Sequence, residues 1–266
     1  MRRTRPLSPN LEAYITKGGR VIELEAAALK TVQRHLDENF ALAVEAMREV
    51  IQSGRKIIVT GIGKSGTIGA KIASTLSSTG APSIVLDAVN ASHGDLGMIA
   101  GGDLLLILSY SGETEEISRL IPSIKRIGAH IVALTGNPAS TLARESDLHI
   151  NVHVPREACP LNLAPTSSST AMLAVGDALA MVLLEARGFK KEDFATFHPG
   201  GTLGRNLLLK VQDIMRTAEQ MAVLPGTATV NQALALLAQM HCGAAAVVDG
   251  RGHLKGIYTH GDFTRG

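Results

Sequence analysis

The stretch Lys56-Ile57-Ile58-Val59-Thr60-Gly61-Ile62-Gly63-Lys64-Ser65-Gly66 decides the fold, because an apolar run passes directly into glycines and small polar residues. This pattern is typical of a buried strand that turns into a helix. A second unit has the same form, with Leu104-Leu105-Leu106-Ile107-Leu108 leading into Ser109-Tyr110-Ser111-Gly112-Glu113-Thr114. Backbone amides and small hydroxyls at such turns are aimed where an anion binds. Two such turns, the second followed by Glu115 and Glu116, predict a phosphorylated small molecule held beside a carboxylate that can act on it.

The composition indicates a large aliphatic core and argues against a nucleic-acid partner. Of 266 residues, 45% are hydrophobic, while 3% are aromatic and none is Trp. The formal net charge is only +2 and the Lys and Arg residues are dispersed, unlike the basic patch of a nucleic-acid-binding protein. The basic start, Met1 to Arg5, is interpreted as a frayed terminus.

Several features of the chain favour a cytoplasmic protein without a membrane partner. No apolar signal region follows the basic start, and no uninterrupted apolar stretch of ~18 residues is present. The two cysteines, Cys159 and Cys242, lie far apart in the chain. Such cysteine usage excludes a disulfide framework and fits a reducing compartment.

From Lys56 onward, apolar strands alternate with amphipathic helices. The expected strands cover residues 57–60, 83–86, 104–109, 130–135 and 148–154, after two N-terminal helices with apolar positions from Val21 to Leu36 and from Phe40 to Ile51. This alternation predicts an α/β fold, a doubly wound parallel five-stranded sheet flanked by helices. A loop rich in Pro and small residues, Pro155 to Pro165, then leads into one long helix from Thr166 to Gly188.

The pattern of apolar and polar residues changes near Lys210, and we place a domain boundary there, between residues 1–210 and 211–266. The terminal segment has a helical pattern from Val230 to Met240 and strand patterns at 244–248 and 256–258, which predicts a small α+β domain. A segment of ~55 residues is near the lower limit for independent folding, so we expect it to pack against a partner.

Two nucleotide-binding motifs resemble the first turn. Gly63-Lys64-Ser65 matches the end of a P-loop, but Ile58 stands where that motif needs its first glycine. Gly61, Gly63 and Gly66 complete G-x-G-x-x-G, and Asp87 ends the next strand where a ribose-binding acid belongs. The cation at Lys64 and the second hydroxyl-rich turn argue against a dinucleotide, so an NAD-dependent oxidoreductase is the less favoured alternative.

Taken together, five segments resemble the D-arabinose-5-phosphate isomerase family. They are Gly61 to Gly66, Ala91 to Met98, Ser111 to Ile117, Glu157 to Leu161 with Leu163 to Ser168, and Phe197 to Gly201. That family joins a sugar isomerase (SIS) domain to a pair of CBS motifs. The resemblance implies an aldose-ketose isomerase that interconverts D-ribulose 5-phosphate and D-arabinose 5-phosphate, without a cofactor, for octulosonic acid and lipopolysaccharide biosynthesis. It also implies a homotetramer.

The resemblance further implies which residues form the site. The family's catalytic residues fall on Lys64, Glu116, Glu157 and His198, and those that bind substrate fall on Gly63, Ser65, His93, Ser109, Ser111, Thr114, Thr166 and Ser167. Isomerisation through an enediol needs a base above the carbon acid, an acid near the oxygens and exclusion of water. Either Glu116 or Glu157 can be the base, and His198 is a candidate acid or base for ring opening.

Two departures from the family pattern affect metal binding and regulation. Asp87 replaces a histidine that binds inhibitory zinc in some relatives, and His149 and His153 share a strand face without a third ligand, so we expect no metal. Thr259-His260-Gly261-Asp262 closes a first CBS motif and the chain then stops. We keep a nucleotide or sugar-nucleotide as the candidate effector of this region.

A competing hypothesis is a regulatory module that senses a sugar phosphate, as in transcription regulators that use this sugar-binding domain. Such regulators carry a DNA-binding helix-turn-helix. The N-terminal helices of this chain are acidic or mixed rather than basic, which disfavours that class.

Overall fold

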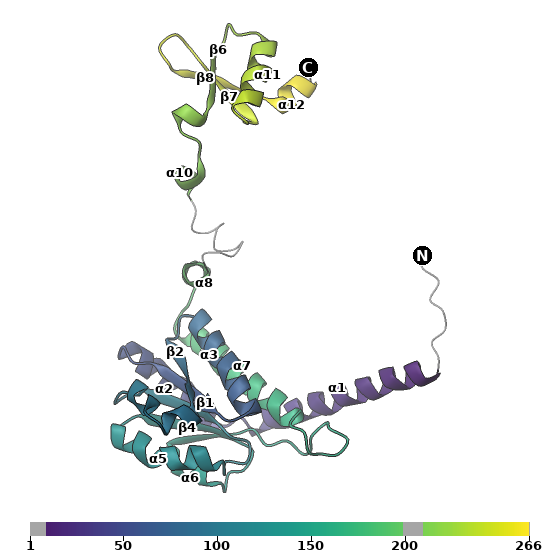
Figure 1. Cartoon of the computed structure of the whole chain (residues 1–266), viewed down its shortest axis with the longest axis vertical. Coiled ribbons are helices and arrows are strands. Elements are labelled where there is room, and N and C mark those ends of the chain that lie inside the picture. Colours follow the sequence, from purple (N-terminus) through teal and green to yellow (C-terminus); the bar gives the residue numbers. More distant parts are fainter. Residues whose placement is uncertain (1–8, 199–209, 266) are drawn as a thin grey trace. The chain divides into compact units, whose positions relative to one another are not determined.

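The computed structural model describes residues 9–198 and 210–265, which fall into two compact units (Figure 1). The basic start and the segment Pro199-Gly200-Gly201 lie outside the described residues. The predicted domain boundary near Lys210 falls at the edge of the undescribed stretch and stays a prediction.

A five-stranded parallel sheet forms the centre of the larger unit, which confirms the predicted fold. Its strands are β1 (Ile57–Gly61), β2 (Ser83–Asp87), β3 (Leu104–Leu108), β4 (His130–Thr135) and β5 (Leu148–Asn151), in the order β2-β1-β3-β4-β5. Every residue of β3 is buried, as its unbroken apolar run predicts. The strand order reverses between β1 and β3, and open α/β sheets bind ligands outside the carboxyl ends of the strands at such a point.

Helices cover both faces of this sheet (Figure 1). On one face lie α1 (Pro9–His35), α2 (Glu38–Gln52), α3 (Lys64–Ser78) and α7 (Ser167–Ala186), and on the other lie α4 (Ala88–Ala91), α5 (Glu115–Ile127) and α6 (Thr141–Glu145). Successive β1 residues serve opposite cores, since Ile57 and Val59 join the first cluster and Ile58 the second. A short 3-10 helix, η1 (Asp95–Met98), precedes β3, and α8 (Lys191–Phe197) follows α7.

The first helix is longer than its apolar spacing predicts. It begins at Pro9, whereas the predicted apolar positions begin at Val21. Leu11, Tyr14 and Ile15 are exposed, and Ala28 and Val32 are buried. Hydrophobic periodicity reports which part of a helix packs on a core, so it marks the packed part of α1 and not where the helix starts.

Among the described residues, α7 is the one helix long and apolar enough to cross a membrane by length and composition. Half of its most apolar window is buried, and the helix packs against α1, α2 and α3. A helix that is hydrophobic all round is typical of a protein core, and this position explains the apolarity of α7.

The smaller unit is an α+β arrangement, as predicted. Its elements are α10 (Val211–Ile214), η2 (Ala218–Gln220), β6 (Ala222–Pro225), α11 (Val230–Gln239), β7 (Ala244–Val248), β8 (Leu254–Thr259) and α12 (His260–Arg265). β7 pairs parallel with β6 and antiparallel with β8. The sequence analysis did not predict β6, which is only 4 residues long and ends in a proline. Ala222, Leu237 and Ala245 form the small buried core.

Candidate active site

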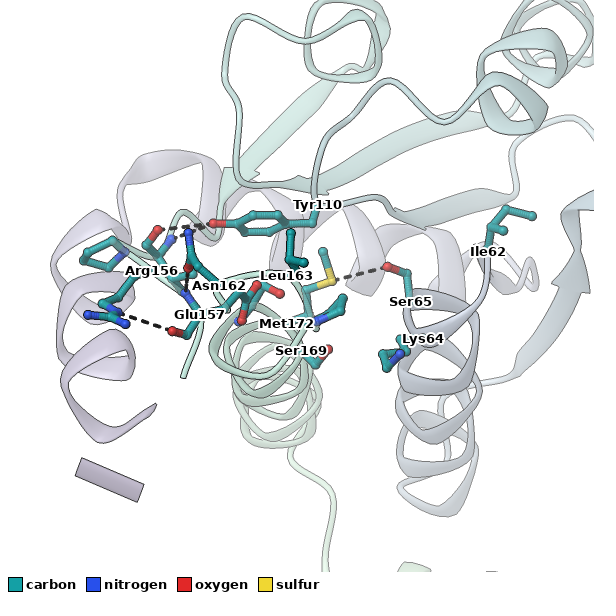
Figure 2. A pocket seen from close by; sticks show the side chains of 14 residues that line it. Ile62, Lys64, Ser65, Tyr110, Arg156, Glu157, Asn162, Leu163, Ser169 and Met172 are labelled. Carbon is teal, nitrogen blue, oxygen red and sulfur yellow. Dashed lines mark hydrogen bonds between the residues drawn. The ribbon is translucent and has the colours of Figure 1, made fainter. Parts of the chain in front are cut away.

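A cavity of about 580 Å³ is built from the segments that follow β1, β3 and β5 together with the start of α7 (Figure 2). It is lined by Ile62, Lys64, Ser65, Tyr110, Val154, Pro155, Arg156, Glu157, Asn162, Leu163, Pro165, Ser168, Ser169 and Met172. Its size lies within the usual range of small-molecule sites, about 300–1,000 Å³. The cavity therefore opens at the edge of the sheet where the strand order predicts a ligand.

Glycines allow the turn after β1 to pass close to β3. A Cβ atom on Gly61 would lie 2.9 Å from the carbonyl oxygen of Leu108, the residue that pairs with it in β3. Gly63 caps α3 with a φ of 58°, a conformation that L side chains rarely adopt. The two turns predicted to bind an anion thus lie side by side, and Lys64 and Ser65 enter the cavity from the first turn of α3.

Lys64 and Glu157 approach the cavity from opposite walls. Figure 2 shows Lys64 and Ser65 on the α3 side and Arg156, Glu157 and Asn162 on the other, with Met172 between them. The Ser65 hydroxyl lies 3.8 Å from the Met172 sulfur, which joins α3 to α7 at the base of the site. The lining contains two cationic side chains, Lys64 and Arg156, and one carboxylate, Glu157. Its net charge is therefore positive, which complements a phosphate.

The Glu157 carboxylate accepts hydrogen bonds from the first turn of α7. Its Oε2 accepts from the Thr166 amide at 2.8 Å, the Thr166 hydroxyl at 3.0 Å and the Ser168 amide at 3.2 Å. Within residues 9–198 and 210–265, no donor reaches its Oε1. One oxygen of the carboxylate is therefore held by the helix start, while the other remains available to a ligand.

Burial and hydrogen bonding act in opposite directions on the pKa of Glu157. Burial alone raises the pKa, but hydrogen bonds from Ser168 and Thr166 outweigh it and leave the pKa below its ordinary value. The positive end of the α7 dipole acts in the same direction as these bonds. Glu157 is consequently a carboxylate at neutral pH.

The hydroxyls of the second turn are engaged with one another. The hydroxyls of Ser109 and Thr114 lie 2.7 Å apart, and Ser109 Oγ also accepts from the Gly112 amide at 3.1 Å. Ser111 is exposed, and its Oγ accepts from the Glu113 amide at 3.2 Å. This turn borders the cavity through Tyr110, so a ligand that binds these hydroxyls must compete with existing hydrogen bonds.

The remaining candidates for substrate binding differ in position. The Thr166 hydroxyl accepts from the Ala158 amide at 2.8 Å as well as donating to Glu157. Ser167 is buried, and its hydroxyl finds no partner in the described part of the chain. Glu116, near the start of α5, and His93, between α4 and η1, are exposed and do not line the cavity of the single chain.

His198 lies at the far end of the helical layer from the cavity. Its ring stacks on Phe194 with centroids 3.9 Å apart, and its Nδ1 lies 3.0 Å from the carbonyl oxygen of Phe194. The adjacent Phe197 lies close to Gly80, just beyond the end of α3, because a Cβ atom on that glycine would be 3.0 Å from its ring. Lys64 begins α3, which has 15 residues and is therefore about 22 Å long. One chain thus does not bring His198 and Lys64 together.

Other singled-out polar residues have structural roles. Asp87 caps α4, where its Oδ1 accepts from the Val89 and Asn90 amides, both at 2.9 Å. The His149 ring lies 2.9 Å from the Thr135 hydroxyl, and His153 Nδ1 lies 3.2 Å from the Gly136 carbonyl oxygen. Across the described residues, no cluster of three or more His, Cys, Asp or Glu side chains could hold a metal ion.

Of the residues that line the cavity, sequence reasoning assigned Lys64, Ser65 and Glu157 to the site and missed the others, among them Tyr110, Arg156 and Asn162. Tyr110 lies in the second turn between Ser109 and Ser111, both of which were assigned to the site, so its place in the sequence could have identified it. The role of Asn162 depends on a positive φ of 53°, which the sequence does not reveal.

Comparisons with known proteins agree with this architecture. The SIS domain model matches residues 50–182, and the CBS domain model matches residues 211–266. The arabinose 5-phosphate isomerase KdsD of Pseudomonas aeruginosa is 47% identical, over 97% of this chain and 78% of its own length. The Escherichia coli K12 protein of the same name is 45% identical over 93% and 75%. A solved structure from E. coli CFT073, in complex with arabinose 5-phosphate, is similar with a TM-score of 0.67 and 36% identity, covering 73% of this chain and 100% of that one.

The contacts of Glu157 predict a pH-dependent contribution to stability. Because the folded state lowers its pKa, the contribution is present above the ordinary pKa, about 4.3, and is lost as the pH falls through the folded value. Glu157→Gln should lower the free energy of unfolding by about 1–2 kcal/mol at pH 7 and by clearly less near pH 3, in urea titrations.

Glu185→Gln, at the other end of α7, is the matched control for this measurement. It removes a carboxylate that opposes the helix dipole, so stability at pH 7 should stay equal or rise slightly. A Glu157→Gln deficit that is equally large at both pH values would contradict the assigned role of the ionised carboxylate.

Proposed function

The chain belongs to the arabinose 5-phosphate isomerase family, and from this premise we propose that its cavity interconverts D-ribulose 5-phosphate and D-arabinose 5-phosphate. This aldose-ketose isomerisation supplies octulosonic acid and lipopolysaccharide biosynthesis. The observation that carries the proposal is that Lys64 and Glu157 line the same cavity, and that no donor among the described residues reaches one oxygen of the Glu157 carboxylate. A cation for the phosphate or a substrate oxygen and a base for the carbon acid are the two groups that the reaction needs most.

The phosphate is proposed to bind near the turns after β1 and β3. Lys64 and Arg156 supply positive charge, and α3 directs the amides of its first turn toward the cavity. Gly63, Ser65, Ser109, Ser111 and Thr114 are the turn residues proposed to surround the substrate. The charge of Lys64 is suited to the oxyanion that develops when a carbonyl becomes an enediolate.

Glu157 is our choice for the base that moves the proton between the two carbons. It lines the cavity and is ionised at neutral pH, whereas Glu116 is exposed in the single chain. A lowered pKa makes a carboxylate a weaker base, so its reactivity must come from position and from the exclusion of water. Thr166 and Ser167 begin the helix that holds Glu157 and are proposed to contact the sugar.

The position of His198 supports a site shared between subunits. At about the length of α3 from Lys64, its imidazole cannot open the ring of a sugar held in the cavity of its own chain. We therefore propose that His198 from a second copy completes the cavity, within the homotetramer that the family resemblance implies. Glu116 and His93, which are exposed here, are proposed to gain their roles in the same assembly.

Two wider proposals concern the rest of the chain and its location. The region 211–266, matched by the CBS model, is proposed to act as a regulatory domain that takes a nucleotide or sugar-nucleotide effector, because all candidate catalytic residues precede it. Cytoplasmic location is supported by the two free cysteines. The reaction as proposed needs no cofactor, because the chain's own side chains can move the proton.

Lys64→Ala tests the proposed activity. With purified protein and D-ribulose 5-phosphate, kcat/KM should fall by about 10²–10³, the loss expected for one preorganised electrostatic group. Lys71→Ala is the matched control, since Lys71 lies on the same helix but forms an ion pair with Asp177 at 2.5 Å. No turnover by the parent protein, or equal kinetics for parent and Lys64→Ala, would contradict the proposal.

Mixed oligomers test whether the site is shared between subunits. Lys64→Ala and His198→Asn should each be nearly inactive alone, because each leaves every cavity without one essential group. After the two are co-refolded, a fraction of the cavities should combine Lys64 of one copy with His198 of another and regain activity. Activity that stays at the level of the separate variants, although mixed oligomers form, would show that both residues serve the same chain.

A further inference from the structure

The segment that carries Glu157 contains neither helix nor strand. It comprises residues 152–166, between the end of β5 at Asn151 and the start of α7 at Ser167. Connections of this length without regular structure are uncommon in compact domains. A catalytic carboxylate must nevertheless be held within about 0.5 Å of its working position. Hydrogen bonds from outside the segment or within it must therefore hold the Glu157 carboxylate in place.

Tyr110 contacts the beginning of this segment from the turn after β3. Its hydroxyl donates to the carbonyl oxygen of Val154 at 3.3 Å and accepts from the amide of the same residue at 3.1 Å (Figure 2). One phenol group thus satisfies both backbone polar groups of Val154, whose side chain is buried. Val154 lies three positions before Glu157 in the chain.

The Tyr110 ring packs against Gly136, the residue that follows β4. A Cβ atom on Gly136 would lie 2.5 Å from Cε2 of the ring, so only glycine leaves room for the ring there. The Gly136 amide also donates to the Tyr110 carbonyl oxygen at 2.9 Å. Burial raises the pKa of the phenol, which therefore keeps its proton and remains a donor at neutral pH.

A second contact holds the backbone of Glu157 from within the segment. Asn162 Oδ1 accepts from the Glu157 amide at 2.8 Å, and the Asn162 amide donates to the Cys159 carbonyl oxygen at 2.8 Å. Asn162 has a φ of 53°, in the left-handed region that asparagine tolerates better than most residues. Hydrogen bonds thus hold the segment at two places: Tyr110 bonds to the backbone of Val154, and Asn162 bonds to the backbone of Glu157.

We infer that Tyr110 is a positioning residue for Glu157, in which the phenol hydroxyl fixes Val154 and thereby sets where the carboxylate meets the substrate. The inference rests on the proposed function, because it takes Glu157 as the base. Tyr110 also belongs to the turn proposed to bind the phosphate, so one side chain links the two parts of the site. Asn162 supports the same carboxylate from the other side.

A double-mutant cycle tests whether Tyr110 acts through Glu157. Tyr110→Phe removes only the hydroxyl and should lower kcat about tenfold with little change in KM, since small misplacements of a reacting group are costly. In the Glu157→Gln background the same change should cost less than about twofold. A tenfold loss that persists in that background, or no loss in either, would overturn the inference. Tyr258→Phe, the same change in the smaller unit, should leave kcat unchanged.

Hydrogen exchange provides a readout that does not depend on turnover. The amides of Thr166 and Ser168 donate to Glu157, so Tyr110→Phe should speed their exchange about fivefold, as loss of one hydrogen bond implies. Asn162→Gly, which keeps the left-handed backbone but removes the acceptor, should have a similar effect. Unchanged exchange in both variants would overturn the positioning role even in an active enzyme. If the parent turns over no pentose phosphate but both variants still exchange faster than the parent, the positioning role stands and the proposed function is refuted.

Discussion

The hydrogen bonds between the Glu157 carboxylate and the first turn of α7 are the contacts on which the site depends. A helix start leaves amides without partners, and here one carboxylate oxygen satisfies two of them. The same contact stabilises a helix at the centre of the core and presents the second oxygen to the cavity. If Glu157 is the proposed base, stability and catalysis are coupled at one side chain, and both constrain the irregular segment before α7.

The pairing of β1 with β3 positions the turns that line the cavity together with this carboxylate. At the amino ends of these strands, Lys56 pairs with the buried Asp103 at 2.7 Å. Burial raises the pKa of Asp103, but the bonds from Lys56 and the Ala100 amide outweigh it, and the pKa lies below its ordinary value. At the carboxyl ends, Gly61 lets the two turns approach one another. The two strands are thus joined by an ion pair at their amino ends, and at their carboxyl ends the turns pack closely against one another.

The sequence was sufficient for the architecture because apolar strand segments alternate with amphipathic helices, and the runs of β1 and β3 each lead into their own turn. It predicted the five-stranded sheet and the α+β terminal unit, and missed β6 and α8, which are too short to show a period. It could not predict that Tyr110 reaches a backbone 44 positions away, because such a contact depends on the packed fold. Nor could it show that His198 lies at the far end of α3 from Lys64, because that distance depends on how the segment after α7 packs near Gly80.

Isomerisation in deuterated water tests most directly the claim that a carboxylate moves a proton through an enediol in this cavity. With D-ribulose 5-phosphate and the parent enzyme taken to equilibrium over many turnovers, we expect deuterium at the second carbon of D-arabinose 5-phosphate, seen as loss of that carbon's proton signal in the NMR spectrum. Carbon-bound hydrogen would then have passed through a group that exchanges with solvent. Product that retains a full proton signal at this position after many interconversions would rule out proton transfer through an exchangeable group and indicate hydride transfer between the carbons.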